Sequence, residues 1–431
     1  MKRYLWEVSV LAICMLILHV MFAMQLVPLL CVGGAGLFLL PVVNRCIRRI
    51  YGKKAEYFEL TAYMEQLICS YKRLGTISPA LEDCRTLYPE ESQMGKVLQQ
   101  ALYILKTGEG AGDHTIVETA LTKIQDLYPS RRLQLLHGFL CKAEKVGGDR
   151  TEELDILLRD MQSWKRRVIL YQKKKQFIRS ESVFAVVMSV LLCYLSLCLI
   201  PWNLREILIR TRIFQYSTAI VIIVLMTAEV VLLHRLTGSW LDIFVQSERD
   251  AIRQQKSYRK VKDQKKGITG YMAKKICQRE VEREFPYWLL SLTLYLQQGG
   301  VYQAVRLSQS LREEGFFQEE VRRLLGAIYD DPVSLHPYLA FFRELDLTEI
   351  QTGMKLLYAV NSNDYKDMGR QIRLLVEQNN VVMDQCEKKQ FDSQIAGMGF
   401  LKQIPMILAC AKVVFDLILL LMLTMGKYLV L

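Results

Sequence analysis

Charged residues lie deep inside two long apolar stretches of the sequence, Glu229 in one stretch and Lys412 and Asp416 in another. The spacing of four places Lys412 and Asp416 on one face of a helix, where they can form an ion pair. An unpaired charge near the middle of a bilayer costs about 2.5–3.5 kcal/mol, so pairing is favoured. We expect Glu229 to complete this intramembrane polar seam, about one helical turn nearer the cytoplasm than Lys412.

Two roles are open for the polar seam. It can be a structural ion pair that fixes how two membrane helices pack against each other. It can also face the membrane helix of another protein and recognise a charge there.

Elsewhere the sequence has no spacing typical of a catalytic, nucleotide-binding or metal site. The glycine-rich stretch from Gly108 to Asp113 lacks the GxxxxGK[ST] pattern of a phosphate-binding loop. The five histidines form no HExxH pattern, and the eleven cysteines include no CxxC pair. Asp330 and Asp331 lack the surrounding spacing of an EF-hand loop. We therefore expect a protein that is not an enzyme and holds no cofactor or metal.

The composition indicates an integral membrane protein with a large water-soluble share. Of 431 residues, 51% are hydrophobic and 23% are charged, and the net charge is +12. The mean hydropathy is +0.14, which is high for a soluble protein of this length. No aromatic-interleaved basic patch accompanies the positive charge, so we expect no nucleic-acid partner.

Five apolar runs are long enough to cross a bilayer once, each about 30 Å as a helix. They are Leu5 to Met24, Leu26 to Asn44, Ser182 to Trp202, Phe214 to Leu233 and Ile404 to Met425. The first could instead be a secretory signal peptide, but Glu7 interrupts it and a second apolar run follows at once. A helical hairpin is the favoured interpretation.

Lysine and arginine residues near the ends of the runs predict the orientation. Basic clusters flank the runs at 2–3, 45–54, 165–179 and 235–266. If the five runs alternate, all these clusters fall on one side, the cytoplasm. The N-terminus is then cytoplasmic and the C-terminus external in the cell membrane, with the basic clusters facing anionic lipids. No cysteine falls in an external loop, so we expect reduced thiols.

The remaining sequence shows helical periodicity with glycine and proline at the breaks, so we predict an all-α protein. The predicted segments are a transmembrane hairpin (1–50), a cytoplasmic helical domain (51–181), a second transmembrane hairpin (182–235), a second cytoplasmic helical domain (236–403) and a C-terminal transmembrane helix (404–431).

The two cytoplasmic segments share a pattern at their helix breaks. Gly75, Ala80 and Leu81 match Gly299, Ala304 and Val305 in spacing, each set following an apolar helix. Further along, Gly138 loosely parallels Gly353. Each segment then ends in a charged helix that runs into an apolar run. We expect a positive φ at both Gly75 and Gly299, where one helix turns into the next.

With Pro405 just inside the last run and Phe285-Pro286 opening the first helix of the second copy, this pattern resembles the F-domain family. These are inner-membrane platform proteins of type II secretion and of type IV and Tad (Flp) pilus assembly. The resemblance covers about Phe58 to the C-terminus, and the N-terminal hairpin is similar to that of the Tad branch. The third run lacks the early proline that Pro405 provides in the fifth.

The resemblance implies a protein that couples a cytoplasmic hexameric secretion ATPase to the assembly of pilin-like subunits. It also implies oligomers with itself or with a paralogous platform protein, and an acidic pilin residue that Lys412 could bind. The alternative is a polytopic transporter or a transporter accessory subunit. Transporter repeats usually lie within the membrane, whereas the repeat here is mostly outside the apolar runs.

Overall fold

The computed structural model describes residues 2–108, 115–238, 240, 248–263, 267–296, 299–309, 315–362 and 365–428. Every regular element within these residues is a helix, which confirms the prediction of an all-α protein. The expected loop at 109–113 lies outside the described residues. The elements are α1 (Lys2–Phe22), α2 (Leu26–Leu74), α3 (Ile77–Arg85), α4 (Gln93–Thr107), α5 (Ile116–Leu127), α6 (Arg131–Val146), α7 (Thr151–Cys198), α8 (Trp202–Arg210), α9 (Arg212–Leu236), α10 (Glu248–Lys262), α11 (Ile268–Leu296), α12 (Val301–Ser308), α13 (Phe316–Asp330), α14 (His336–Ala340), η2 (Arg343–Leu345), α15 (Thr348–Ser362), α16 (Tyr365–Leu401) and α17 (Ile404–Tyr428).

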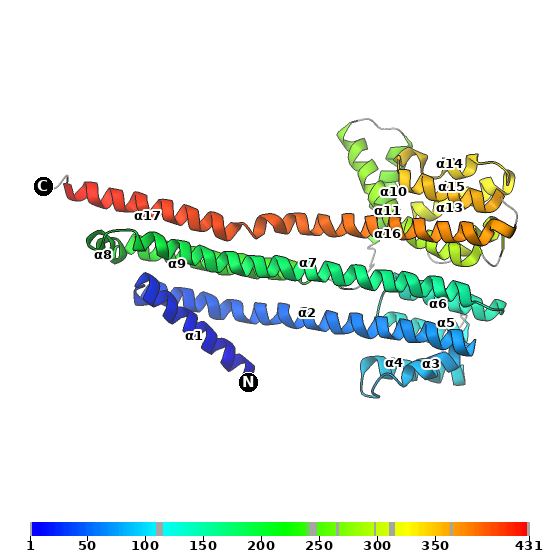
Figure 1. Ribbon diagram of the computed structural model, residues 1–431, viewed down its shortest axis with the longest axis horizontal. Helices are drawn as coiled ribbons and strands as arrows, with labels where there is room; N and C mark the ends of the chain where they lie inside the picture. The colour runs from blue at the N-terminus through cyan, green and yellow to red at the C-terminus, as the bar shows by residue number, and fades with distance from the viewer. Residues whose placement is uncertain are drawn as a thin grey trace. The chain divides into compact units, whose positions relative to one another are not determined.

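The chain divides into two compact units, which we call the apolar unit and the polar unit. The apolar unit comprises Met1–Lys54, Ile169–Trp240 and Phe391–Leu431, and the polar unit comprises Ala55–Val168 and Leu241–Gln390. Helices α2, α7 and α16 each contribute residues to both units, and Figure 1 shows the first two as long continuous helices.

Four helical stretches of the described residues are long and apolar enough to cross a membrane. They are Leu26–Leu74, Thr151–Cys198, Arg212–Leu236 and the stretch Gly369–Met425, which includes most of α17. The first predicted run falls in α1, whose apolar stretch Trp6–Phe22 is shorter than these. Large apolar side chains such as Val20, Phe38 and Met422 are exposed on the apolar unit, as expected of a surface that contacts lipid.

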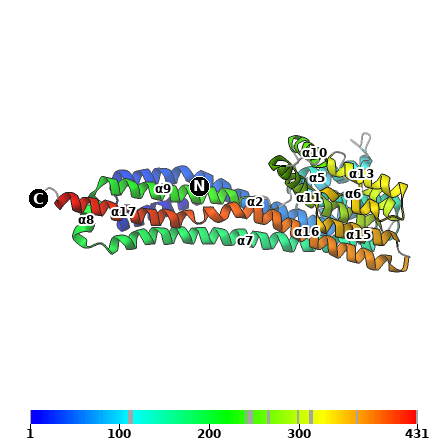
Figure 2. The ribbon, with the colours of Figure 1, turned by 90° about the horizontal axis from the view of Figure 1, so that it is seen from above.

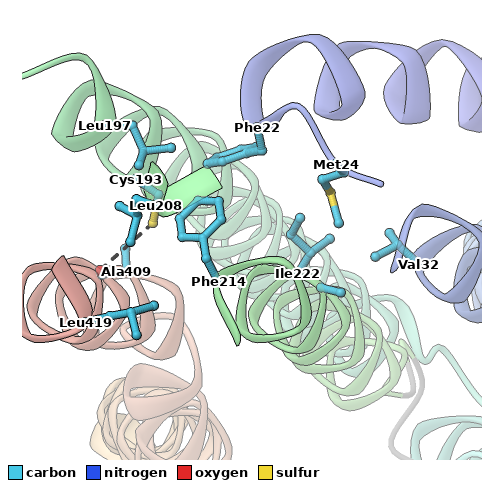
Figure 3. Close-up of a cluster of buried hydrophobic side chains, with 11 residues drawn as sticks. Phe22, Met24, Val32, Cys193, Leu197, Leu208, Phe214, Ile222, Ala409 and Leu419 are labelled. Atoms are coloured by element: carbon cyan, nitrogen blue, oxygen red, sulfur yellow. Dashed lines mark hydrogen bonds between the residues drawn. The ribbon is translucent and has the colours of Figure 1, made fainter. Parts of the chain in front are cut away.

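One cluster of buried side chains joins the helices of the apolar unit (Figure 3). Phe22 and Met24 come from the end of α1 and the turn after it, and Val32 comes from α2. The same cluster contains side chains from four more helices: Cys193 and Leu197 of α7, Leu208 of α8, Phe214 and Ile222 of α9, and Ala409 and Leu419 of α17. In addition, the Asn44 amide of α2 donates a hydrogen bond to Glu7 of α1, so α1 and α2 form a hairpin.

The polar unit has its own apolar core. In the part after α10, a group of aromatic rings surrounds Trp288, whose ring stacks on Phe341 with centroids 5.4 Å apart. The indole nitrogen of Trp288 donates a hydrogen bond to Ser308 Oγ at 2.9 Å, so this buried polar group has a partner. In the part before α7, the buried side chains include Leu60, Leu67, Leu98 and Leu133.

The helix break at Gly75 has the predicted backbone, but the break at Gly299 does not. Gly75 has a φ of +74°, and its N–H donates to the carbonyl of Tyr71 at 2.8 Å, which ends α2. The φ of Gly299 is outside the positive range, so the prediction for this residue is wrong. Gly300, which precedes α12, is extended with a φ of −63°, so neither glycine before α12 has the left-handed backbone that ends α2 at Gly75.

Candidate functional site

Lys412 and Asp416 form the predicted ion pair within one turn of α17. Their side chains are only 3% and 5% exposed. The ammonium of Lys412 also lies 4.2 Å from the centroid of the Phe214 ring, in the first turn of α9. The cation is therefore enclosed between its own carboxylate and an aromatic face of the neighbouring helix, a favourable arrangement for a desolvated charge.

The surroundings of this pair are apolar and closely packed. Phe214 belongs to the buried cluster of the apolar unit, as do Ala409 and Leu419 of α17 (Figure 3). The Cys193 thiol of α7 donates a weak hydrogen bond to the carbonyl of Ala409, at 3.9 Å. The pair thus faces the inside of the helix group and presents little charged surface to a helix of another protein.

Glu229 is not part of this seam. It lies 15 residues after Phe214 on the same helix, which corresponds to about 22 Å along α9. Its carboxylate instead accepts a hydrogen bond of 2.5 Å from Ser182 Oγ of α7. The prediction that Glu229 lies one helical turn from Lys412 is therefore wrong. The position of a residue within one apolar run does not determine which turn of another helix packs beside it.

A second group of polar contacts lies around Glu229, about 22 Å along α9 from Phe214. Ser182, which binds Glu229, is 1% exposed. Its neighbour Glu181 forms an ion pair of 2.9 Å with Lys402, in the turn before α17. These contacts connect α7 to α9 and to the start of α17, so the group fixes the relative positions of three helices.

A buried glutamine, which the sequence analysis did not single out, holds two turns of the apolar unit together. Gln215 of α9 is 1% exposed, and its side-chain oxygen accepts from the Gln25 N–H at 3.0 Å. Its amide nitrogen donates to the carbonyl oxygens of Ala23 and Ile209, at 3.2 and 2.9 Å. Ala23 has a φ of +45°, so Gln215 satisfies the backbone of a turn in an uncommon conformation. The sequence signal that could have identified it is a polar amide side chain inside an apolar run.

In the polar unit, Arg132 of α6 is the centre of a buried charge cluster. Its guanidinium donates to Asp160 at 3.2 Å, to the Tyr287 hydroxyl at 3.0 Å and to Glu387 at 3.0 Å. The same group lies 4.8 Å from the centroid of the Trp164 ring. Four helices, α6, α7, α11 and α16, therefore meet at a single arginine that is 4% exposed.

Two more ion pairs extend this cluster. Arg167 of α7 binds the second carboxylate oxygen of Glu387 at 2.6 Å. Arg131 of α6 forms an ion pair with Glu284 of α11, and both side chains are about nine-tenths buried. We refer to the residues of these pairs, together with Asp160 and Arg132, as the Arg132 cluster. It links the part of the polar unit before α7 to the part after α10.

His137 occupies a closed site in the polar unit. Its two ring nitrogens lie 3.0 Å from the Tyr63 hydroxyl and 3.1 Å from the Gln125 amide nitrogen. The ring is 1% exposed, and burial lowers the pKa of His137 to about 3. The imidazole is therefore neutral at physiological pH and acts as a core residue.

The residues that carry the family resemblance lie mainly in packed positions. Ala80 and Ala304 are fully buried in α3 and α12. Gly138 lies in α6 and Gly353 in α15, where an added Cβ would come within 3.0 Å of the Phe285 ring. Pro405 is the second residue of α17, a position where a missing N–H costs little. These residues position helices and do not converge on one site.

Within the described part of the chain, no three His, Cys, Asp or Glu side chains are grouped as metal ligands would be. Comparisons with protein-family models, curated proteins and solved structures find no match to this chain.

Proposed function

We propose that this chain is a platform protein of the F-domain type. It spans the cell membrane with five helices, and it couples a cytoplasmic hexameric secretion ATPase to the assembly of pilin-like subunits. The proposal rests on the sequence resemblance. The observation that supports it best is the parallel order of helices in the two parts of the polar unit.

Corresponding helices carry corresponding residues in those two parts. Helix α3 follows Gly75, and its Ala80 and Leu81 are fully buried. Helix α12 follows the glycine pair at 299–300, and its Ala304 and Val305 are fully buried in the same way. Each part then ends in a long helix, α7 or α16, whose later residues belong to the apolar unit. This parallel supports a duplicated domain followed by a membrane helix.

The Arg132 cluster supports a role in passing on mechanical work. Removing one member of a buried ion pair is costly, so the helices that share Arg132 are expected to move together. A polar unit held in this way could take up a movement of the ATPase without coming apart. The closed Lys412–Asp416 pair supports a packing role in the apolar unit, and the pilin-contacting surface then lies elsewhere.

Co-purification tests this proposal. The full chain, in membranes that also contain a hexameric secretion ATPase and its pilin-like subunit, is extracted and captured through a terminal tag. We expect the ATPase to be retained, both as wild type and with its phosphate-binding lysine replaced, because docking does not need hydrolysis. The purified chain alone should not hydrolyse ATP.

Two results would contradict the proposal. One is ATP hydrolysis by the chain without the ATPase. The other is solute uptake into proteoliposomes that contain only this chain, together with failure to retain the ATPase, which would indicate a transporter. Genes for a secretion ATPase and a prepilin beside the gene for this chain would add independent support.

A further inference from the structure

Helices α10 and α11 enclose a groove of about 530 Å³ in the polar unit. The two helices lie side by side (Figure 2). The groove combines apolar and positively charged side chains, mainly Ile252, Met272 and Ile276 together with Arg253, Lys256 and Lys260. None of the described residues that line it is acidic.

The apolar side chains at this groove are unusually exposed. Ile252 is 54% exposed and Met272 is 60% exposed. The neighbouring Ile268 and Tyr271, at the start of α11, are exposed to a greater extent still. Exposed apolar side chains such as Ile252 and Met272, gathered in one groove, usually mark a site where something binds.

The occupant must satisfy apolar contacts and several positive charges at once. A bilayer surface that contains anionic lipids does so, because its headgroups attract the cations and its interface accepts apolar side chains. Chain continuity favours the same occupant. Helix α9 is apolar enough to cross a membrane and ends at Leu236, and α10 begins at Glu248. The eleven connecting residues can span about 40 Å at most, so the chain tethers the start of α10 within that distance of the end of α9.

We propose that the α10–α11 groove binds the surface of an anionic lipid bilayer. Arg253, Lys256 and Lys260 contact the lipid phosphates, and Ile252 and Met272 enter the interface between headgroups and acyl chains. This binding does not depend on the secretion function proposed above. It requires only that the apolar unit is inserted in a membrane.

Photo-crosslinking in nanodiscs tests the proposal with the full chain. A benzophenone amino acid replaces Met272, and the mass of the labelled peptide reports whether lipid has been attached. We expect at least fivefold more lipid adduct in discs with 30% phosphatidylserine than in discs of phosphatidylcholine alone. Because exposed charges are screened by salt, 0.5 M NaCl should remove most of this difference.

A matched pair of triple variants assigns the effect to the groove. Arg253→Gln, Lys256→Gln and Lys260→Gln together should bring the adduct in anionic discs down to the level in neutral discs. The control is Lys96→Gln, Lys123→Gln and Arg306→Gln, three exposed cations of the polar unit outside the groove, and it should keep the adduct. All six substituted residues are exposed, so unchanged thermal unfolding is expected for both variants.

Equal adduct in neutral and anionic discs would overturn the proposal. So would adduct that persists in the groove variant, or labelling at Met272 that appears only when an acidic protein is added. The last result would identify the groove as a protein-binding site.

Discussion

The Lys412–Asp416 pair and the Arg132 cluster are both buried groups of charges, but they differ in how far apart their members lie in the sequence. The first is formed by residues four apart in one helix, and its outer contact is the Phe214 ring. The second brings together residues from α6, α7, α11 and α16, up to 255 positions apart in the sequence. An ion pair within one helix lowers the free-energy cost of placing its two charges in a bilayer. A cluster of residues from several helices determines how those helices pack together.

The largest effect should come from removing the centre of the long-range cluster. Arg132→Ala takes away the cation that Asp160 and Glu387 share, and we expect a loss of about 3–5 kcal/mol in unfolding free energy. Thermal unfolding of the detergent-solubilised chain measures it, with a fall of roughly 5–10 °C in the midpoint. As a control, Lys389→Ala removes a pair with Glu282 in which the lysine is 58% exposed, and it should cost less than about 1 kcal/mol. Equal effects of the two variants would contradict the conclusion that the buried Arg132 cluster stabilises the polar unit more than an exposed ion pair does.

The local pair should respond to single and double replacement in opposite ways. Lys412→Leu alone leaves the Asp416 carboxylate buried without its cation, at a cost of about 2.5–3.5 kcal/mol in the bilayer. Lys412→Leu combined with Asp416→Leu removes both charges and should regain most of the wild-type stability, since an apolar replacement of a buried pair is often neutral. Thermal unfolding in lipid nanodiscs compares the three proteins. A double variant less stable than the single one would show that the charges do more than pair with each other.

His137 should make the stability of the polar unit depend on pH. Its pKa is about 3 in the folded chain and about 6.5 when unfolded, so between these values only the unfolded state takes up the proton. The contribution is complete above pH 6.5 and falls as the pH decreases, by about 2 kcal/mol between pH 7.5 and pH 5. Urea unfolding at the two pH values measures this change. His137→Gln, which keeps a polar partner for Tyr63, should show a smaller difference between them, and an unchanged difference would exclude the histidine as its source.

The smallest effect should distinguish the two glycine breaks. Gly75→Ala places a Cβ on a residue with a φ of +74°, which costs about 1–2 kcal/mol. Gly299→Ala adds a Cβ whose nearest neighbours all belong to the flexible Gln303 side chain, the terminal Oε1 being the closest, so it should cost less. Thermal unfolding of both variants gives the comparison. A greater loss from Gly299→Ala would mean that the two turns are not distinguished by their φ values.

The difference between local contacts and contacts of residues far apart in the sequence also explains what could be predicted from the sequence. Helical class, the apolar runs, the stop at Gly75 and the Lys412–Asp416 pair all depend on residues within one or two helical turns, and periodicity or spacing reveals them. The partner of Glu229, the contacts of Gln215 and the Arg132 cluster depend on which helices become neighbours. No local pattern encodes that information. Charged residues such as Arg132 and Glu387 look like ordinary solvent-exposed positions of charged helices until the fold brings them together.

Gln215 has a consequence for how the chain is made. The turn between α1 and α2 is completed by a side chain 190 residues later in the sequence. At a synthesis rate of 5–20 residues per second, the ribosome needs about 10–40 s to deliver that residue. During this interval the N–H of Gln25 and the carbonyl of Ala23 must find other hydrogen-bond partners, so the α1–α2 hairpin is first made with an unfinished turn. Closure of that turn is therefore a late event in biogenesis, timed by the arrival of α9.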